Sequence, residues 1–186
     1  WRQEIFNALS RVAIYERCTV ENKCIRVTNG DGSTIDILPC LEVGTDEVLF
    51  WATGRDGQPQ PIYSYPALHQ KRTEQRDMDT EGSYRHYVRS IKYGKAALVD
   101  AGVISHEDAP SYFLECLVHS TEVGASSTSP SPEQFDKLLD QLARAGHETE
   151  PATVSGHSLV FGPELWQWNV KDKDKFVAQL RERLDI

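Results

Sequence analysis

The sequence predicts an α+β fold in which an antiparallel three-stranded meander precedes a helical bundle. Two observations lead to this prediction. Short apolar segments separated by turns rich in Asn, Asp and Gly fill the first sixty residues, and segments with helical periodicity dominate after residue 80. The 186 residues, 39% of them hydrophobic, suffice for one globular domain or for two small ones. We therefore expect a sheet-containing part over residues 1–60 and a helical part over residues 61–186.

The meander is predicted from strands that alternate with turns. A helix is expected first, over residues 1–15, where Ile5, Leu9 and Val12 recur at near-helical spacing. A strand over residues 18–28 then runs into Asn29-Gly30-Asp31-Gly32, a strong hairpin signal because these residues tolerate positive φ. The remaining two strands are expected over residues 33–43 and 47–53.

The strand expected over residues 33–43 carries a carboxylate, Asp36, between Ile35 and Ile37. Alternation of apolar residues along it predicts a buried strand. A charge in such surroundings needs a proton, a cationic partner or a metal ion. The alternative is an aspartate at a strand edge, either solvated or paired with Arg26.

Residues 58–80 are polar and contain three prolines, which indicates a surface crossing with a short helix that starts near Pro66. Beyond the crossing, apolar residues recur at helical spacing in several segments. An irregular connection with some strand character at 158–161 is expected before the last helix. The expected helices cover residues 81–101, 109–122, 132–145 and the later part of 164–185, with 109–122 as the buried centre of the bundle.

A basic ridge runs along the helix expected at 81–101. Arg85, Arg89, Lys92 and Lys95 recur at nearly helical spacing in a chain whose net charge is −8. Like charges one turn apart repel, so the ridge either faces solvent or faces an anion. The next helix opens close to Ser111 and Tyr112, where free backbone N–H groups favour anions.

Composition excludes several classes of protein. The net charge of −8 argues against broad nucleic-acid binding, and no apolar run is long enough to span a bilayer. The four cysteines lack zinc-ligand spacing, and we expect Cys40 and Cys116 to be reduced core residues of a cytoplasmic protein. The six histidines are interpreted as surface or capping residues. Neither a nucleophile elbow nor a P-loop is present.

Four motifs, in order, resemble those of a known family. They are Asp36-Ile-Leu-Pro-Cys-Leu-Glu42, Tyr65-Pro-Ala-Leu-His69, the segment from Thr80 to Lys92, and Pro110-Ser-Tyr-Phe-Leu-Glu115. Together they are similar to the template-independent, polymerase-β-like nucleotidyltransferases of the oligoadenylate synthetase and cyclic-GMP-AMP synthase type. The resemblance is to the branch of bacterial cyclic-oligonucleotide synthases of antiphage defence. It covers most of residues 20–122, and the residues after 124 share only a general helical character.

The resemblance implies a role for each matching residue. Asp36 would be a catalytic carboxylate that binds a Mg²⁺ or Mn²⁺ pair. Lys92 and Ser111 would contact the triphosphate of an ATP or other NTP substrate, with Arg89 assisting. Tyr112 would stack on the donor base. The ridge and the helix start, read independently, are also suitable places for phosphate.

The same family carries a Gly-Ser and an Asp-x-Asp motif upstream of the carboxylate that Asp36 matches. Here Gly32-Ser33 lies too close to Asp36 to serve, and the Asp-x-Asp matches at 77–79 and 172–174 lie downstream of it. One carboxylate cannot hold two metal ions, so we expect an inactive C-terminal portion of an enzyme, completed by an upstream part of the same protein. Two alternatives stay open: a non-catalytic module that senses nucleotide or binds a partner protein, and another polymerase-β-like transferase that tails RNA or modifies small molecules. Neither the nucleotides joined nor a regulatory partner can be named from the sequence.

Overall fold

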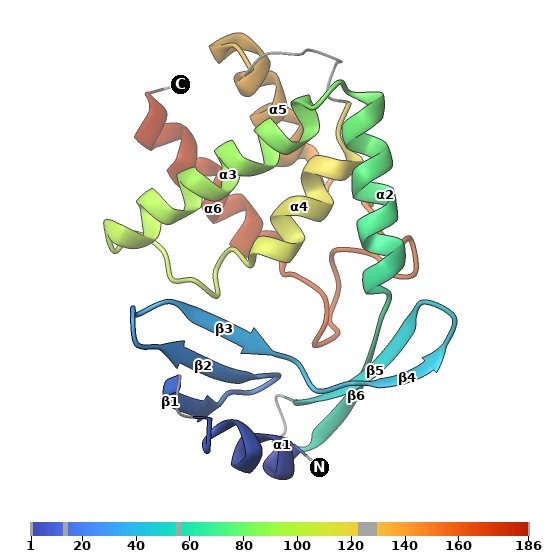
Figure 1. Cartoon of the computed structure of the whole chain (residues 1–186). Helices are drawn as coiled ribbons and strands as arrows, with labels where there is room; N and C mark the ends of the chain where they lie inside the picture. The colour runs from blue at the N-terminus through green and yellow to red at the C-terminus, as the bar shows by residue number, and fades with distance from the viewer. Residues whose placement is uncertain (1, 13–14, 55–56, 123–129, 186) are drawn as a thin grey trace. The chain divides into compact units, whose positions relative to one another are not determined.

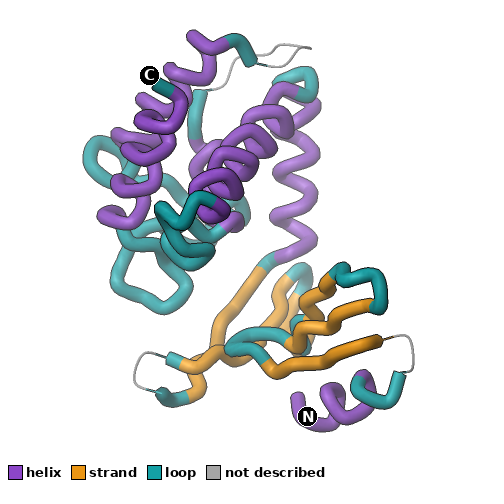
Figure 2. The backbone as a smooth tube through the Cα atoms, turned by 90° about the vertical axis from the view of Figure 1, so that its left-hand side faces the viewer, coloured by secondary structure: helices purple, strands orange, loops and turns teal. Residues whose placement is uncertain are grey.

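A computed structural model of the chain describes all residues except 1, 13–14, 55–56, 123–129 and 186 (Figure 1). The chain divides into two compact units, Trp1–Pro66 and Ala67–Ile186, called here the first and second units. Strands belong to the first unit and all described helices except α1 and the first residue of α2 belong to the second, as the colours of Figure 2 show. The predicted α+β class is confirmed. The assignment of separate domains to 1–60 and 61–186 stays a prediction.

The first unit contains one helix and two three-stranded antiparallel sheets, each with its strands in sequence order. Residues on neighbouring strands therefore pair across short turns, as Arg26 and Asp36 do. The elements are α1 (Arg2–Leu9), β1 (Tyr15–Val20), β2 (Ile25–Asn29), β3 (Thr34–Ile37), β4 (Leu41–Gly44), β5 (Glu47–Thr53) and β6 (Pro59–Ser64).

The hairpin turn and β5 are where the sequence places them, but three expectations for this unit are wrong. The helix over residues 1–15 ends at Leu9, and the strand over residues 18–28 is in fact the two strands β1 and β2. The strand over residues 33–43 breaks around Pro39 into β3 and β4, which lie in different sheets. Proline has no N–H to donate, so it does not sit in a continuous ladder.

The sixth strand, β6, replaces part of the expected irregular crossing. Its two prolines, Pro59 and Pro61, are tolerated because β6 is an edge strand, paired only with β5 in its sheet. Its apolar contribution to the first unit is Ile62, which is 5% exposed.

The prediction that Asp36 lies in a buried strand is also wrong. Every residue of β3 except Ile37 is exposed, and so is all of β4. Ile35 itself is 50% exposed. The buried strand of this sheet is β2, through Ile25 and Val27. Cys40, in the break between β3 and β4, is exposed and not a core residue, whereas Cys116 is buried as expected; both carry free thiols.

The second unit is a helical bundle. The expected short helix near Pro66 is a helix of 14 residues, and the other helices fall close to their predicted ranges. The predicted strand character at 158–161 amounts to isolated bridges, such as Ala152 with Leu159. The helices are α2 (Pro66–Asp79), α3 (Ser83–Asp100), α4 (Ser111–Ser120), α5 (Pro132–Arg144) and α6 (Val170–Leu184).

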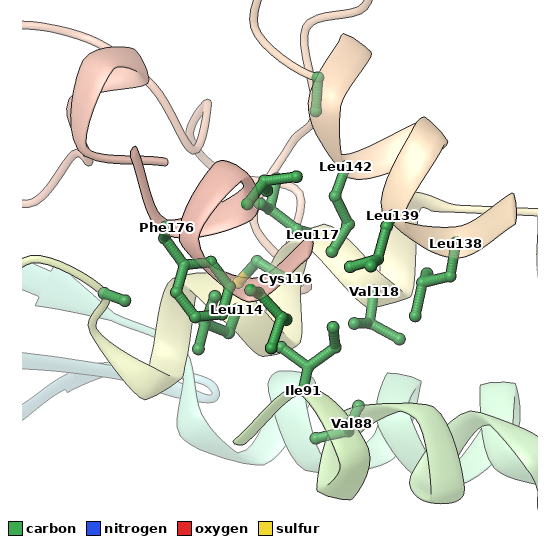
Figure 3. Close-up of a cluster of buried hydrophobic side chains, with 14 of the residues drawn as sticks. Val88, Ile91, Leu114, Cys116, Leu117, Val118, Leu138, Leu139, Leu142 and Phe176 are labelled. Atoms are coloured by element: carbon green, nitrogen blue, oxygen red, sulfur yellow. The ribbon is translucent and has the colours of Figure 1, made fainter. Parts of the chain in front are cut away.

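The core of the second unit forms around α4, as predicted. Leu114, Cys116, Leu117 and Val118 are each at most 1% exposed. Figure 3 shows these side chains between residues of α3, α5 and α6. These buried residues anchor α4 in the core, whereas its first two residues, Ser111 and Tyr112, are exposed. No described helix is long and apolar enough to cross a membrane.

Candidate functional site

Two lysines of α3 lie near the start of α4. Lys92 and Lys95 are one helical turn apart, so their side chains share a face of α3. Lys95 is only 7% exposed, and its Nζ lies 3.4 Å from the Ser111 Oγ. No carboxylate among the described residues forms an ion pair with Lys95. Burial, and secondarily repulsion from Lys92, lowers the pKa of Lys95, so the bare site holds its positive charge at a cost.

Ser111 and Tyr112 are the first residues of α4, where the first backbone N–H groups have no partner within the helix. The N-cap residue, Pro110, has extended backbone and makes no side-chain cap. This end of α4 therefore presents donors and the positive end of the helix dipole beside the two lysines.

Glu115, one turn into α4, is the negative partner of the cluster. Its Oε2 accepts a hydrogen bond from Lys92 Nζ at 2.7 Å, and its Oε1 lies 3.3 Å from His69 Nε2 on α2. The His69 hydrogen bond and then Lys92 lower the pKa of Glu115 to about 2, against the effect of burial. Glu115 is therefore an anion throughout the neutral range and ties α2 and α3 to α4.

Tyr112 presents an aromatic ring beside these charges. It is 46% exposed, and one face packs on the His69 ring, with centroids 5.5 Å apart and planes 29° apart. Burial raises the pKa of the Tyr112 hydroxyl well above its ordinary value. Tyr112 therefore keeps nearly half of its surface open to solvent, and an aromatic ring of this kind is suited to stacking against a flat ligand.

The other members of the basic ridge differ in their surroundings. Arg85 pairs with Asp77, at 3.3 Å. Arg89 is exposed and forms no ion pair with another described residue. The ridge is therefore not one uniform solvated face: its cations range from paired and exposed to buried.

Asp36 belongs to the first unit and is paired with Arg26, as in the alternative expected from the sequence. Both of its oxygens accept hydrogen bonds from Arg26, Oδ1 from Nε at 2.8 Å and Oδ2 from Nη2 at 2.9 Å. The Arg26 guanidinium holds the pKa of the Asp36 carboxyl below its usual range, although the pair is about half exposed. The structure thus brings Lys92, Ser111 and Tyr112 into one cluster, while Asp36 is paired locally in another unit.

The described residues do not fit a metal pair by themselves. Among the residues that the structure places, no three His, Cys, Asp or Glu side chains gather in a group that could hold a metal ion. Asp36, the carboxylate that the family resemblance singles out, is already bound by a guanidinium on both oxygens. Two hard cations need several carboxylate oxygens, which these residues do not supply.

Sequence reasoning missed three members of the cluster as site residues: His69, Lys95 and Glu115. Lys95 was visible as part of the ridge, and Glu115 as the fourth residue after Ser111, on the same face of a helix. His69 was interpreted as a surface or capping residue, which is wrong because its side chain is 21% exposed, pairs with Glu115 and packs on Tyr112.

Comparison with known proteins decides the family. Residues 71–185, more than half of the chain, match the model of the cGAS/DncV-like nucleotidyltransferase C-terminal helical domain. The chain belongs to this family. The match includes Lys92, Lys95, Ser111, Tyr112 and Glu115, whereas His69 lies two residues before the match begins.

Two proteins similar in sequence to this chain are cyclic nucleotide synthases. The chain is 28% identical over 110 residues to the cyclic dipurine nucleotide synthase of Elizabethkingia meningoseptica, covering 54% of this chain and 36% of that protein. It is 22% identical over 178 residues to cyclic nucleotide synthase CdnE01 of Staphylococcus haemolyticus, covering 88% of this chain and 58% of that protein. The chain therefore spans between about a third and three fifths of these relatives' length.

A solved structure shares the fold. The CdnE cyclic dinucleotide synthase of Elizabethkingia meningoseptica, determined with GTP and Apcpp, matches with a TM-score of 0.80 at 20% identity. The match covers 100% of this chain and 70% of that protein. At this identity the likeness establishes the fold alone.

Proposed function

We propose that the second unit binds the triphosphate of a nucleoside triphosphate. The protein to which the chain belongs would then be a nucleotidyltransferase that makes cyclic or linear oligonucleotide second messengers in antiviral, that is antiphage, signalling. The observation that carries the proposal is Lys95: a buried ammonium with no carboxylate partner among the residues that the structure describes, 3.4 Å from Ser111 Oγ at the start of α4. A buried cation of this kind is stabilised when an anion binds beside it.

Each residue of the cluster has a part in this proposal. Lys95 and Lys92 supply positive charge to the phosphates, and Ser111 supplies its hydroxyl and the backbone donors of α4. Arg89, exposed and without an ion pair among the described residues, is able to reach an anion. Tyr112 offers a ring for the base, and such stacking is worth about 1–3 kcal/mol per base whatever the base.

The catalytic carboxylate and its metal are a separate part of the proposal. Asp36 would be one ligand of a Mg²⁺ or Mn²⁺ pair, and the other carboxylates would come from outside this chain. Arg26 would have to release at least one Asp36 oxygen for that to happen. We propose that the chain on its own binds nucleotide and does not join nucleotides.

The bidentate Arg26–Asp36 pair also supports the second candidate, a non-catalytic module that senses nucleotide or binds a partner protein. In such a module Asp36 would serve only the stability of its hairpin. The alternative of an RNA-tailing or small-molecule-modifying transferase is set aside, because the matched domain is that of the cGAS/DncV-like family.

Two experiments test the proposal. Isothermal titration of the chain with ATP is expected to show binding that Lys92→Met and Ser111→Ala each weaken about tenfold or more. Lys137→Met, which removes a positive charge from exposed α5 surface, serves as the control and should have little effect. Binding that none of these changes alters would contradict the proposed site.

The second experiment separates the enzyme from the sensor. The protein encoded by the full-length open reading frame is incubated with the four NTPs and Mg²⁺ or Mn²⁺, and the products are resolved by chromatography. Formation of an oligonucleotide that Asp36→Asn abolishes supports the transferase, whereas nucleotide binding without any product favours the sensing module.

A further inference from the structure

The contacts behind Tyr112 form a chain that ends at Lys92. Tyr112 packs on the His69 ring at 5.5 Å, His69 Nε2 lies 3.3 Å from Glu115 Oε1, and Glu115 Oε2 accepts from Lys92 Nζ at 2.7 Å. One carboxylate, that of Glu115, therefore contacts both His69 and Lys92. All four residues lie in the same compact unit, on α2, α3 and α4.

His69 is held in one orientation. Its Nδ1 is buried and has no hydrogen-bond partner among the described residues, so a proton at that atom would be unsatisfied. Glu115 is ionised and can only accept, which requires a proton on Nε2. The imidazole is thereby held by the hydrogen bond from its Nε2 to Glu115 and by the packing of its face against Tyr112.

We propose that His69 and Glu115 are positioning residues for the nucleotide: His69 backs Tyr112 so that its exposed face meets the base, and Glu115 couples this stack to Lys92 at the phosphates. This inference rests on the proposed triphosphate site and adds to it the way in which base and phosphates are held together. Neither residue is assigned contact with the nucleotide itself.

The arrangement makes a specific energetic prediction. A ring that must be ordered before it can stack loses part of the stacking free energy as entropy, whereas a ring already backed by another does not. Removing the backing ring should therefore weaken binding of a ligand with a base and leave binding of a ligand without one unchanged.

Two substitutions at position 69 separate the ring from the hydrogen bond. His69→Gln keeps an N–H donor for Glu115 and removes the ring, and His69→Phe keeps a ring and removes the donor. His147→Gln is the matched control, because His147 also pairs with a carboxylate, that of Asp174 at 2.9 Å, and is not part of this cluster. The ligands are ATP and inorganic tripolyphosphate, titrated into each folded variant by calorimetry.

His69→Gln is expected to weaken ATP binding about tenfold and to change tripolyphosphate binding less than twofold. His69→Phe should weaken ATP binding about threefold, less than His69→Gln, because the backing ring stays and the hydrogen bond to Glu115 is lost. His147→Gln should match the unaltered chain. The proposal is overturned if His69→Gln leaves ATP binding intact, or if it weakens both ligands equally as general damage would.

The same titrations distinguish this inference from the proposed function. If the unaltered chain binds tripolyphosphate as tightly as ATP, the phosphate site stands and the positioning proposal fails. If it binds neither, the proposed function fails as well. A nitrogen-15 NMR spectrum of the imidazole rings at pH 8 checks the geometry without any ligand: the Nε2–H tautomer of His69 is expected, and the Nδ1–H tautomer would contradict it.

Discussion

Arg26 holds both oxygens of Asp36 across the β2–β3 pair, at 2.8 and 2.9 Å. The two residues face each other directly in the strand register, so the pair follows from the hairpin and needs no other part of the chain. The carboxylate that the family resemblance assigns to metal is thus occupied by a cation of its own sheet. Any catalytic role for Asp36 therefore begins with loosening that pair.

The ion pair between Arg26 and Asp36 predicts how the pKa of the Asp36 carboxyl changes when Arg26 is replaced. Because the folded-state pKa is lowered, the pair adds stability above the ordinary aspartate pKa, and this stability is lost as pH falls through the folded value. Arg26→Met should return the Asp36 pKa towards its ordinary range, measured by carbon-13 NMR of the carboxyl group. Arg17→Met, which removes an exposed arginine from β1 of the same sheet, is the control; an unchanged Asp36 titration in Arg26→Met would contradict the pairing.

Glu115 predicts a pH-dependent stability in the second unit. Its pKa of about 2 lies below the unfolded value, so its contribution is complete above about pH 4.5 and disappears as pH falls towards 2. Glu115→Gln should lower the free energy of unfolding by about 2 kcal/mol at pH 7, allowing for partial exposure. Urea unfolding at several pH values measures this effect, with Glu148→Gln on the exposed surface as the control. The variant and unaltered chains should converge near pH 2, and a constant difference at every pH would rule out the charge as the cause.

The burial of Lys95 predicts that removing its charge has opposite effects on the stability of the chain and on its binding of ATP. A buried ammonium with one long contact costs free energy, so Lys95→Met should stabilise the unliganded chain by about 1 kcal/mol. The same change should weaken ATP binding, because the phosphates lose a cation. Thermal unfolding with and without ATP gives both quantities. A variant that is less stable and binds ATP normally would show that Lys95 is a structural residue.

The sequence was a good guide where local signals agree with packing. β5 is bounded by turn residues, and α3, α4, α5 and α6 have strong helical periodicity, so their ranges are predicted closely. Local signals failed at Pro39, which splits a continuous apolar pattern, and at Pro59 and Pro61, which disguise an edge strand.

The site was predictable only in part. Lys92, Ser111 and Tyr112 are noticed because of motifs within single helices, and the structure brings them together. Glu115 has its two partners on α2 and α3, 46 and 23 residues away, so no local spacing reveals its role. The burial of Lys95 likewise depends on how α3 packs on α4, which a charge pattern along one helix cannot show.

The claim that the start of α4 and the lysines of α3 bind a triphosphate is tested most directly by residue-resolved NMR. Titration of the isotope-labelled chain with ATP should shift the backbone amide signals of Ser111 and Tyr112 and the side-chain signals of Lys92 and Lys95, with one common affinity. Shifts confined to other parts of the chain, or no saturable shifts at millimolar ATP, would contradict the account.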